Sequence, residues 1–390
     1  MYTLTLKKNE EKRILLGHPW VYANEVAKIE GKDAQGSIAK VCAFDGRFIG
    51  YGFINHLSKI IVRILTRRDE IIDKDFFKKR IVNANDLRVN LGFNDNYRVC
   101  FGENDLLPGL VVDKYGDYLC VQFLTLGMEV RKDMILDILE EIFSPKGIYE
   151  RSDVSVREKE GLKQFKGVVR GAINSPVLIN ENGVKMFVDL ENGQKTGYFL
   201  DQKENRLNLR RYVKDKTVLD CFSNVGGFAL NAAIGGAKDV TALDISEIAV
   251  EYIRKNAELN GLKNIKTECA DVFERLREYR REEKKFDVII LDPPAFTKSK
   301  ETVKEGYKGY KDINIQALKL LRSGGILVTC SCSQHLTVNL FNDMLKESIS
   351  QAGVNAKMLE LRIQSRDHST LIGLDEGLYL KVAVLYVWKN

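Results

Sequence analysis

The first 70 residues carry short runs of β-branched and aromatic residues that are separated by turns. The clearest runs are VCAFDGRFIGYGFI at 41–54 and KIIVRIL at 59–65, and an aromatic turn, GHPWVYANEV, precedes them at 17–26. Such residues favour extended strands, whereas Gly and Asp favour the turns between strands. The pattern therefore predicts a small β-barrel for residues 1–70.

Residues 71–188 combine helical and strand periodicities. Apolar residues recur at helical spacing in 73–93 and again in 127–143. Between them, 109–124 is typical of two strands joined by a turn at Lys114–Asp117. Further strand-like segments follow these helices, and the region is therefore expected to form an α+β middle domain.

From residue 189 to residue 390 the pattern changes to buried strands that alternate with helices. The strand-like runs are TVLDCF (217–222), DVTALDIS (239–246), IKTECADV (265–272), FDVIILDPP (286–294) and GGILVTCSCS (324–333). The helical runs include SEIAVEYIRKNAELNGL (246–262) and INIQALKLLRSG (313–324). This alternation predicts an α/β fold with a doubly wound, Rossmann-like and mainly parallel sheet.

Composition narrows the class of protein. A chain of 390 residues with 44% hydrophobic and 29% charged residues is typical of a globular protein of two or three domains. The charged N-terminal segment lacks the apolar core of a signal peptide, and no apolar run is long enough to cross a membrane, so we expect a cytoplasmic protein. The net charge of +6 is compatible with a polyanionic partner. The seven cysteines have no CxxC spacing, which favours reduced thiols and no metal site.

Carboxylates follow several of the predicted strands in the third region. VLDCFSNVGGF opens into a loop at Gly226, where a glycine lets the backbone approach a ligand closely. Asp244 ends the next strand and Asp271 the one after it. Each Asp can be a helix N-cap, but together they lie where open α/β sheets bind ligands, and Asp244 is placed to accept ribose hydroxyls. The pattern favours a nucleoside site.

Asp292-Pro293-Pro294 ends the fourth strand of this region, and Phe296 follows it. Proline cannot extend a strand ladder, so the two prolines stop the strand and make its exit rigid. A rigid polar edge beside an aromatic ring is suited to binding a planar base. Pro293, Pro294 and Phe296 are therefore candidate substrate-binding residues.

Two cysteines, Cys330 and Cys332, lie two positions apart in the fifth strand and so point to the same face. A cysteine at such a place is either a small buried apolar residue or, if its thiolate is stabilised, a nucleophile. Cys332 lies nearer the ligand-binding edge of the sheet than Cys330.

At these residues the chain resembles S-adenosylmethionine-dependent methyltransferases of class I, and more narrowly the bacterial large-subunit (23S) ribosomal RNA cytosine-5 methyltransferase I family. The resemblance covers essentially the whole chain. It is carried by GHPWVY, GENDLLPGLVVDKYGDYL, ENGQKTGYFLDQKENR, VLDCFSNVGGFAL, ALDIS, DVF, LDPPAF and SCS, in this order. It implies an N-terminal PUA domain that binds RNA, a ribosomal RNA substrate, and S-adenosylmethionine as the cofactor.

The resemblance also assigns roles to single residues. Asp244 would hold the ribose and Asp271 the adenine amino group, and Cys332 would be the nucleophile, with Cys330 as packing. The remaining cofactor-binding residues that it implies are Lys195, Thr196 and Tyr198, which would close over the site, with Phe222, Ser223, Asn224, Gly226, Ile245, Val272 and Asp292. Some other RNA cytosine methyltransferases have a cysteine directly after the fourth-strand motif, where this chain has Pro293 and Pro294.

The chemistry of cytosine explains the need for these residue types. Carbon 5 is a poor nucleophile, and thiolate attack at carbon 6 raises its electron density. Asp292 is placed to stabilise charge or a proton at ring nitrogen 3 and is therefore a second candidate catalytic residue. The base that removes the proton from carbon 5 is not identified by the sequence.

Other functions stay open at this point. A guanine-N7 or exocyclic-amine methyltransferase needs no cysteine, and DPPAFTKSK resembles a stretch of a ribosomal guanine methyltransferase family. A non-catalytic RNA-binding assembly factor would not need the full set of carboxylates. A nicotinamide-dependent oxidoreductase is disfavoured because the first glycine turn lacks GxGxxG. A second copy of the chain is a further partner that the sequence leaves open.

Overall fold

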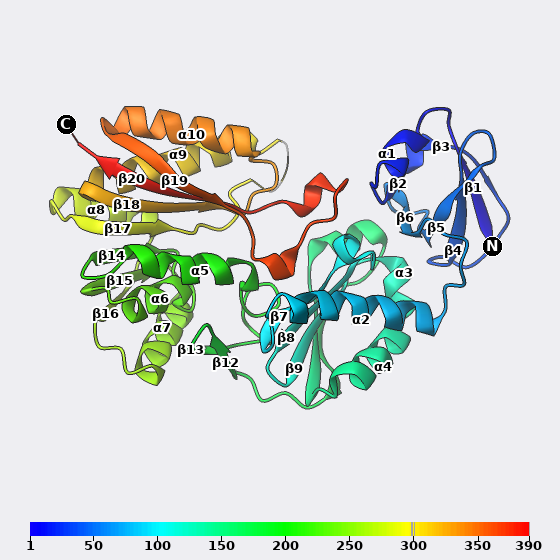
Figure 1. Cartoon of the computed structure of the whole chain (residues 1–390), viewed down its shortest axis with the longest axis horizontal. Helices are drawn as coiled ribbons and strands as arrows, with labels where there is room; N and C mark the ends of the chain where they lie inside the picture. The colour runs from blue at the N-terminus through cyan, green and yellow to red at the C-terminus, as the bar shows by residue number, and fades with distance from the viewer. Residues whose placement is uncertain (298, 300, 390) are drawn as a thin grey trace. The chain divides into compact units, whose positions relative to one another are not determined.

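The computed structural model describes residues 1–297, 299 and 301–389, and the chain divides into two compact units (Figure 1). The first unit comprises Met1–Ile179, Val188–Leu200 and Arg366–Gly377. The second comprises Asn180–Phe187, Asp201–Ser365 and Leu378–Asn390. Both units are therefore assembled from segments that are far apart in the sequence. The boundaries 1–70, 71–188 and 189–390 stay predictions.

The N-terminal part of the first unit is a six-stranded sheet in the order β2-β6-β5-β4-β1-β3, beside the short helix α1 (Glu11–Leu15). Its strands are β1 (Tyr2–Leu6), β2 (Trp20–Tyr22), β3 (Val26–Glu30), β4 (Ile38–Cys42), β5 (Phe48–Ile54) and β6 (Ile60–Thr66). Neighbouring strands are antiparallel except for β1 and β4, and alternate residues such as Leu4 and Leu6 are fully buried. The strands expected in this region are confirmed.

A five-stranded sheet in the order β11-β10-β9-β8-β7 forms the rest of the first unit. Its strands are β7 (Asn96–Phe101), β8 (Leu110–Tyr115), β9 (Tyr118–Phe123), β10 (Gly147–Ser152) and β11 (Phe165–Gly171), and its helices are α2 (Lys74–Asn90), α3 (Leu126–Glu129) and α4 (Lys132–Phe143). The side chain of Asp73 accepts a hydrogen bond from the Phe76 N–H and so caps α2. β8 and β9 pair as the expected hairpin.

Two helices predicted from periodicity have different bounds in the structure. Residues 127–143 do not form one helix: α3 ends at Glu129, where the Arg131 N–H bonds to the Met128 carbonyl, three residues back. The helix expected at 313–324 is α9 (Val303–Leu320), which starts earlier and ends before Leu321. Leu321 is extended and pairs with Phe286, because strand pairing overrides the local helical pattern there.

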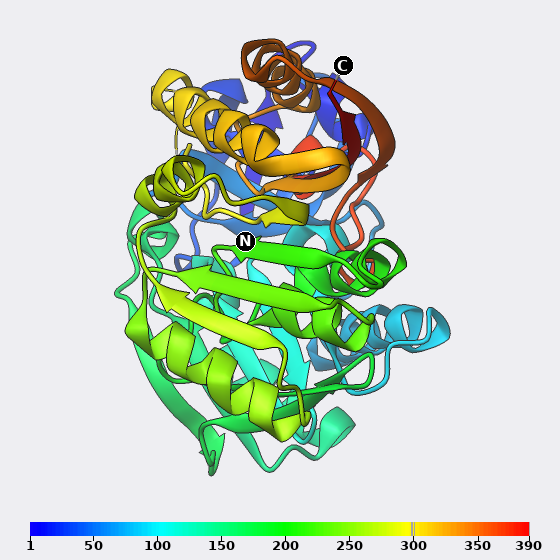
Figure 2. The same ribbon diagram turned by 90° about the vertical axis from the view of Figure 1, so that its left-hand side faces the viewer.

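The second unit contains a seven-stranded sheet in the order β16-β15-β14-β17-β18-β20-β19. Its strands are β14 (Thr217–Cys221), β15 (Asp239–Asp244), β16 (Ile265–Cys269), β17 (Phe286–Leu291), β18 (Leu321–Ser331), β19 (Asn355–Arg362) and β20 (Lys381–Trp388). The first five strands in this order are parallel and run side by side in Figure 2, whereas β20 is antiparallel to β18 and β19. The expected α/β fold with a mainly parallel sheet is confirmed.

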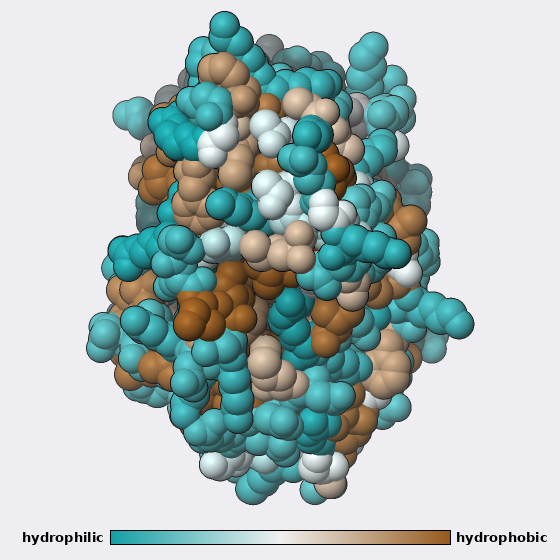
Figure 3. All heavy atoms as spheres, turned by 90° about the vertical axis from the view of Figure 1, so that its right-hand side faces the viewer, coloured by the Kyte–Doolittle hydropathy of each residue, from teal (hydrophilic) through white to brown (hydrophobic). Residues whose placement is uncertain are grey.

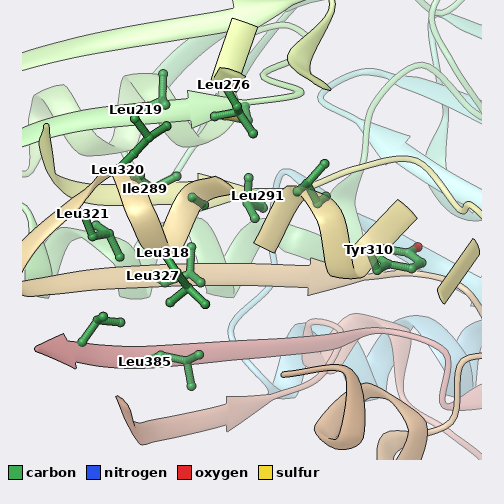
Figure 4. Packing of buried hydrophobic residues seen from close by; sticks show 14 of the residues in the cluster. Leu219, Leu276, Ile289, Leu291, Tyr310, Leu318, Leu320, Leu321, Leu327 and Leu385 are labelled. Atoms are coloured by element: carbon green, nitrogen blue, oxygen red, sulfur yellow. The ribbon is translucent and has the colours of Figure 1, made fainter. Parts of the chain in front are cut away.

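Helices cover both faces of this sheet, and alternate strand residues enter different cores. They are α5 (Lys203–Leu209), α6 (Gly227–Ile234), α7 (Glu247–Leu259), α8 (Val272–Arg281), α9 and α10 (Val338–Ala352). Leu219 and Ile289 pack with α8, α9 and α10 residues in one cluster (Figure 4), whereas Val218 and Val288 pack with α6 and α7 residues in another. A separate two-stranded sheet consists of β12 (Val177–Glu181) and β13 (Val184–Val188).

Hydrophilic side chains cover most of the face drawn in Figure 3, where hydrophobic residues occur in small groups. In the described part of the chain, no helix combines the length and apolar character that a membrane span requires. Within the same residues, no cluster of His, Cys, Asp and Glu is suited to a metal ion.

Candidate active site

The parallel strands of the second unit bring several predicted residues to one edge of the sheet. Cys221 pairs with Leu243 on one side and with Leu291 on the other, so the residues after them, Asp244 and Asp292, follow at the same level. Leu291 in turn pairs with Thr329, two residues before the end of β18. Because the carboxyl ends of parallel strands meet at one edge, Asp244, Asp292 and the end of β18 share the ligand-binding side of the fold.

The loop after β14 has an unusual backbone. Phe222, Asn224 and Gly226 all have positive φ angles, of 62°, 51° and 91°. Gly and Asn adopt this conformation readily, whereas for Phe it costs about 1–2 kcal/mol. The sequence indicated the glycine of this loop, but the strained Phe222 has no local sequence signal. The N–H groups of Ser223 and Gly226 bond to the carbonyls of Leu243 and Ser223, so the tight turn before α6 is fixed from within the protein.

Asp220 holds this loop from inside the sheet. Its side chain is fully buried and accepts hydrogen bonds from the Ser223 hydroxyl and, at 2.9 Å, from the Ala229 N–H. Burial, reinforced by the nearby carboxylates of Asp292 and Asp244, raises the pKa of Asp220 to about 7. The sequence showed an acidic residue at this strand end but assigned it no role.

Asp244 joins two loops at the end of β15. One carboxylate oxygen accepts a hydrogen bond from the Asn224 N–H and the other from the Ser246 N–H, both at 2.9 Å. Each carboxylate oxygen has two lone pairs, so these bonds leave acceptor capacity for ligand hydroxyls. The next residue, Ile245, is an apolar side chain that is 69% exposed, which is suited to contact with a flat ligand.

Asp271 and Val272 have structural roles in addition to those predicted. The Asp271 side chain accepts a hydrogen bond of 3.1 Å from the Glu274 N–H and is the N-cap of α8, the alternative raised from the sequence. Val272 is buried in the hydrophobic core, so its backbone, rather than its side chain, is the part suited to contact a cofactor. Their predicted binding roles stay predictions.

The Asp-Pro-Pro segment is held by a side chain that the sequence analysis did not assign. Gln202 donates a hydrogen bond of 2.8 Å from Nε2 to Asp292 Oδ1, and its own Oε1 accepts one of 2.8 Å from Asn205. Pro293 is buried and Pro294 exposed. Gln202 lies within the ENGQKTGYFLDQKENR motif, so the sequence marks its neighbourhood as relevant. Its partner Asp292 lies 90 residues later, and no local pattern connects the two.

Phe296 lies in an aromatic cluster and is partly buried. Its ring centroid lies 4.6 Å from that of Tyr310, 5.8 Å from that of Phe273 and 6.3 Å from that of Phe222. These ring contacts hold Phe296 in place and so support the Asp-Pro-Pro turn that precedes it. The role of Phe296 in stacking on a base stays a prediction.

The two cysteines of β18 differ in their environments. Cys330 is fully buried in the apolar cluster of one sheet face, and burial raises the pKa of its thiol well above the ordinary value. Cys332 directly follows β18 and is partly exposed, with its Sγ 3.9 Å from the carbonyl oxygen of Pro293. The predicted division between Cys330 as packing and Cys332 as the nucleophile stays a prediction.

Lys195, Thr196 and Tyr198 belong to the first unit. Thr196 is buried and donates a hydrogen bond of 2.6 Å to Asp113, and Tyr115 donates one of 3.3 Å to the Tyr198 carbonyl. Lys195 is exposed, with its ammonium 4.5 Å from the centre of the Phe199 ring. Thr196 and Tyr198 thus anchor this segment, and its closure over a cofactor stays a prediction.

Comparison with known proteins agrees with both parts of the structure. Residues 4–67 match the model of a PUA-like domain family, and residues 170–363 match that of S-adenosylmethionine-dependent methyltransferases. A solved structure from Streptococcus mutans, described as a candidate SAM-dependent methyltransferase, has a TM-score of 0.84 at 23% identity, covering 99% of this chain and 100% of that one.

Full-length relatives define the family more narrowly. The chain is 43% identical over 387 residues to a protein of Aeromonas salmonicida named ribosomal RNA large subunit methyltransferase I, with 97% of this chain and 98% of the relative covered. It is 42% identical over 385 residues to the protein of the same name from Klebsiella pneumoniae, with 97% and 96% covered. The chain therefore belongs to the ribosomal RNA large subunit methyltransferase I family, and it is an S-adenosylmethionine-dependent ribosomal RNA methyltransferase with an N-terminal PUA-like domain.

Proposed function

We propose that this enzyme methylates carbon 5 of a cytosine in large-subunit ribosomal RNA and that Cys332 is its nucleophile. The observation that carries the proposal is the position of Cys332. Cys332 directly follows β18, and its thiol is partly exposed. The thiol lies beside the carbonyl of Pro293, the residue after Asp292. The proposed nucleophile, Cys332, and a polar group for the base, Asp292, thus lie at the edge of the sheet where enzymes with open α/β sheets bind their ligands.

The residues of this edge fit S-adenosylmethionine. Asp244 retains acceptor capacity for the ribose hydroxyls, and the exposed Ile245 offers an apolar surface for the adenine. The strained loop at Phe222 and Asn224, with Gly226, would contact the methionine end, and Asp271 the adenine amino group. When bound, the cofactor supplies an electrophilic methyl group.

The chain's own groups would then act on the base. The Cys332 thiolate forms a bond to carbon 6, and the electron pair of the 5–6 double bond moves toward carbon 5 and ring nitrogen 3. Asp292, held by Gln202, would act in its protonated form: it donates its proton to nitrogen 3 as charge develops there and takes the proton back when carbon 5 is methylated. Carbon 5 would then bond to the methyl group as the bond between that methyl group and the sulfur of the cofactor breaks. Loss of the carbon-5 proton to a base restores the double bond, and the carbon–sulfur bond breaks to return the thiolate.

Trapping with 5-fluorocytosine tests this function. Large-subunit ribosomal RNA transcribed with 5-fluorocytidine in place of cytidine should form a covalent adduct with the wild type, because fluorine at carbon 5 does not leave as a proton. The adduct should survive on a denaturing gel. Cys330→Ala should still form it and Cys332→Ala should not, so these two cysteines, two positions apart, serve as a matched pair.

The alternatives predict other outcomes. Methylation of guanine N7 or of an exocyclic amine gives no adduct, and activity then survives in Cys332→Ala. Lys300, the last residue of DPPAFTKSK and part of its resemblance to guanine methyltransferases, lies outside the described residues. Mass mapping of the methylated nucleoside would identify the base directly. A product other than 5-methylcytidine would refute the proposal.

A further inference from the structure

Lys381 is a buried lysine in β20 that lies beside the end of β18, the strand that Cys332 directly follows. It begins β20, which pairs antiparallel to β18 with Lys381 opposite Ser331. Only 3% of the residue is exposed, which is rare for a lysine. A buried cation needs compensating interactions, so its partners at this place are informative.

The partners of Lys381 are carbonyl oxygens. Its Nζ donates hydrogen bonds of 2.7 Å to the carbonyl of Ser333, the residue after Cys332, and of 2.8 Å to the carbonyl of Tyr379. Within residues 1–297, 299 and 301–389, no carboxylate forms an ion pair with this ammonium. An ammonium has three N–H donors, and the two carbonyl oxygens accept from two of them. Carbonyl oxygens do not neutralise the positive charge, which is therefore available to a neighbouring anion.

The charge of Lys381 interacts with that of Cys332. Burial lowers the pKa of Lys381 to about 8, and the Cys332 thiolate acts in the opposite direction by favouring the ammonium. Around neutral pH the lysine is thus mainly charged. Among the described residues, the titratable groups near Cys332 include Cys330, the Tyr310 hydroxyl, which bonds to the Ser333 hydroxyl at 2.8 Å, and Asp292, which is held by Gln202.

We infer that Lys381 is the positioning residue of the nucleophile: it orients the Ser331-Cys332-Ser333 turn through the Ser333 carbonyl and stabilises the Cys332 thiolate by its charge. This role rests on the proposed cysteine mechanism. The lysine transfers no proton. When the thiolate attacks carbon 6 the negative charge moves into the base, and the ammonium stabilises the thiolate again when the carbon–sulfur bond breaks.

The experiment measures the reactivity of the thiol without RNA. In the full-length protein, Cys269 is the other cysteine with an accessible side chain, and the remaining five are buried. In a Cys269→Ser background, the rate of alkylation of Cys332 by iodoacetamide is followed from pH 5.5 to 9.5, with the modified residue identified by mass spectrometry. The midpoint of this profile reports the pKa of the thiol.

Three variants separate charge from packing. Lys381→Gln keeps an N–H donor but loses the charge, and should slow alkylation at pH 7 about tenfold, corresponding to a thiol pKa roughly one unit higher. Lys381→Arg keeps the charge and should stay near the wild-type rate. Lys389→Gln is the matched control, because Lys389 also donates to a backbone carbonyl, that of Leu321 at 2.6 Å, which begins β18 at the end opposite Cys332.

Binding of S-adenosylmethionine shows whether each variant is folded. Equal pH profiles in wild type and in a folded Lys381→Gln would overturn the inference, as would equal slowing by Lys389→Gln. If Lys381→Gln does not fold, Lys381→Arg is compared with Lys381→Met, which removes the charge. Equal shifts of these two pH profiles from that of the wild type would also overturn the inference. If the pKa of the thiol depends on Lys381 but no 5-fluorocytosine adduct forms, the positioning role is supported and the proposed function is refuted.

Discussion

The backbone N–H of Asn224 donates a hydrogen bond of 2.9 Å to the carboxylate of Asp244. This bond ties the strained loop after β14 to the end of β15, so two parts of the proposed cofactor site are held in a fixed relation before any ligand binds. The carboxylate of Asp244 thus organises the loop in addition to the ligand-binding role proposed for it.

Asp244→Ala should weaken binding of S-adenosylmethionine and of its demethylated product by roughly 1.5–3 kcal/mol or more, because charged hydrogen bonds to the ribose are lost. Isothermal calorimetry measures the effect. Asp239→Ala, at the opposite end of the same strand, is the matched control and should bind both ligands normally. Equal affinities for wild type and Asp244→Ala would remove Asp244 from the site.

Asp220 should make stability depend on pH. Its pKa in the folded protein, about 7, lies above the ordinary value of 3.8, so the folded chain binds this proton more tightly than the unfolded chain. The resulting stability is complete below pH 3.8 and is lost as the pH rises through 7, by about 4 kcal/mol at most.

Asp220→Asn mimics the protonated form and should therefore gain stability relative to the wild type between pH 5 and pH 8. Urea unfolding midpoints at several pH values measure the difference between the two proteins. Curves that stay parallel over this interval would mean that Asp220 does not titrate there.

The N-terminal part of the chain should bind RNA through its phosphates. Residues 1–70 cannot simply be deleted, because Phe53 stacks on Phe77 of α2 and Leu65 joins the same core cluster. We therefore expect the double variant Lys8→Gln/Lys12→Gln, which changes exposed side chains, to weaken RNA binding and to reduce the slope of log affinity against log salt by about 0.7 per lost phosphate contact.

Fluorescence anisotropy at several salt concentrations measures this slope. The control is Lys255→Gln/Lys346→Gln, which removes two exposed lysines of the second unit that pair with Glu251 and Asp343. If both double variants lower the affinity for RNA equally, residues 1–70 bind RNA no more strongly than the second unit does.

The two cysteines of β18 should respond differently to alanine. Cys332→Ala should abolish methyl transfer and keep cofactor binding, because the thiol acts on the base. Cys330→Ala should keep methyl transfer and lose about 1 kcal/mol of stability, since removing one sulfur from a packed position leaves a small cavity. Assays of methyl transfer and unfolding midpoints of both variants check this. Loss of activity in Cys330→Ala alone would exchange the two assignments.

The sequence alone was sufficient for the repeating α/β pattern and for the residues at strand ends. Buried parallel strands read as apolar runs, and the residue that ends such a run is local information, so Gly226, Asp244, Asp292 and Cys332 could be named in advance. The family resemblance in the same motifs supplied the cofactor and the substrate class, which the comparisons confirmed.

The tertiary structure decided which distant residues meet. Gln202 contacts Asp292 across 90 residues of sequence, and Lys381 donates to Ser333 across 48. The segment Arg366–Gly377, between β19 and β20, belongs to the first unit, where Arg88 donates to the Asp367 carbonyl. Local periodicity reports which face of an element is apolar, whereas pairing over long distances depends on the topology of the whole sheet. For this reason only the folded chain shows Lys381 beside Cys332, the proposed nucleophile.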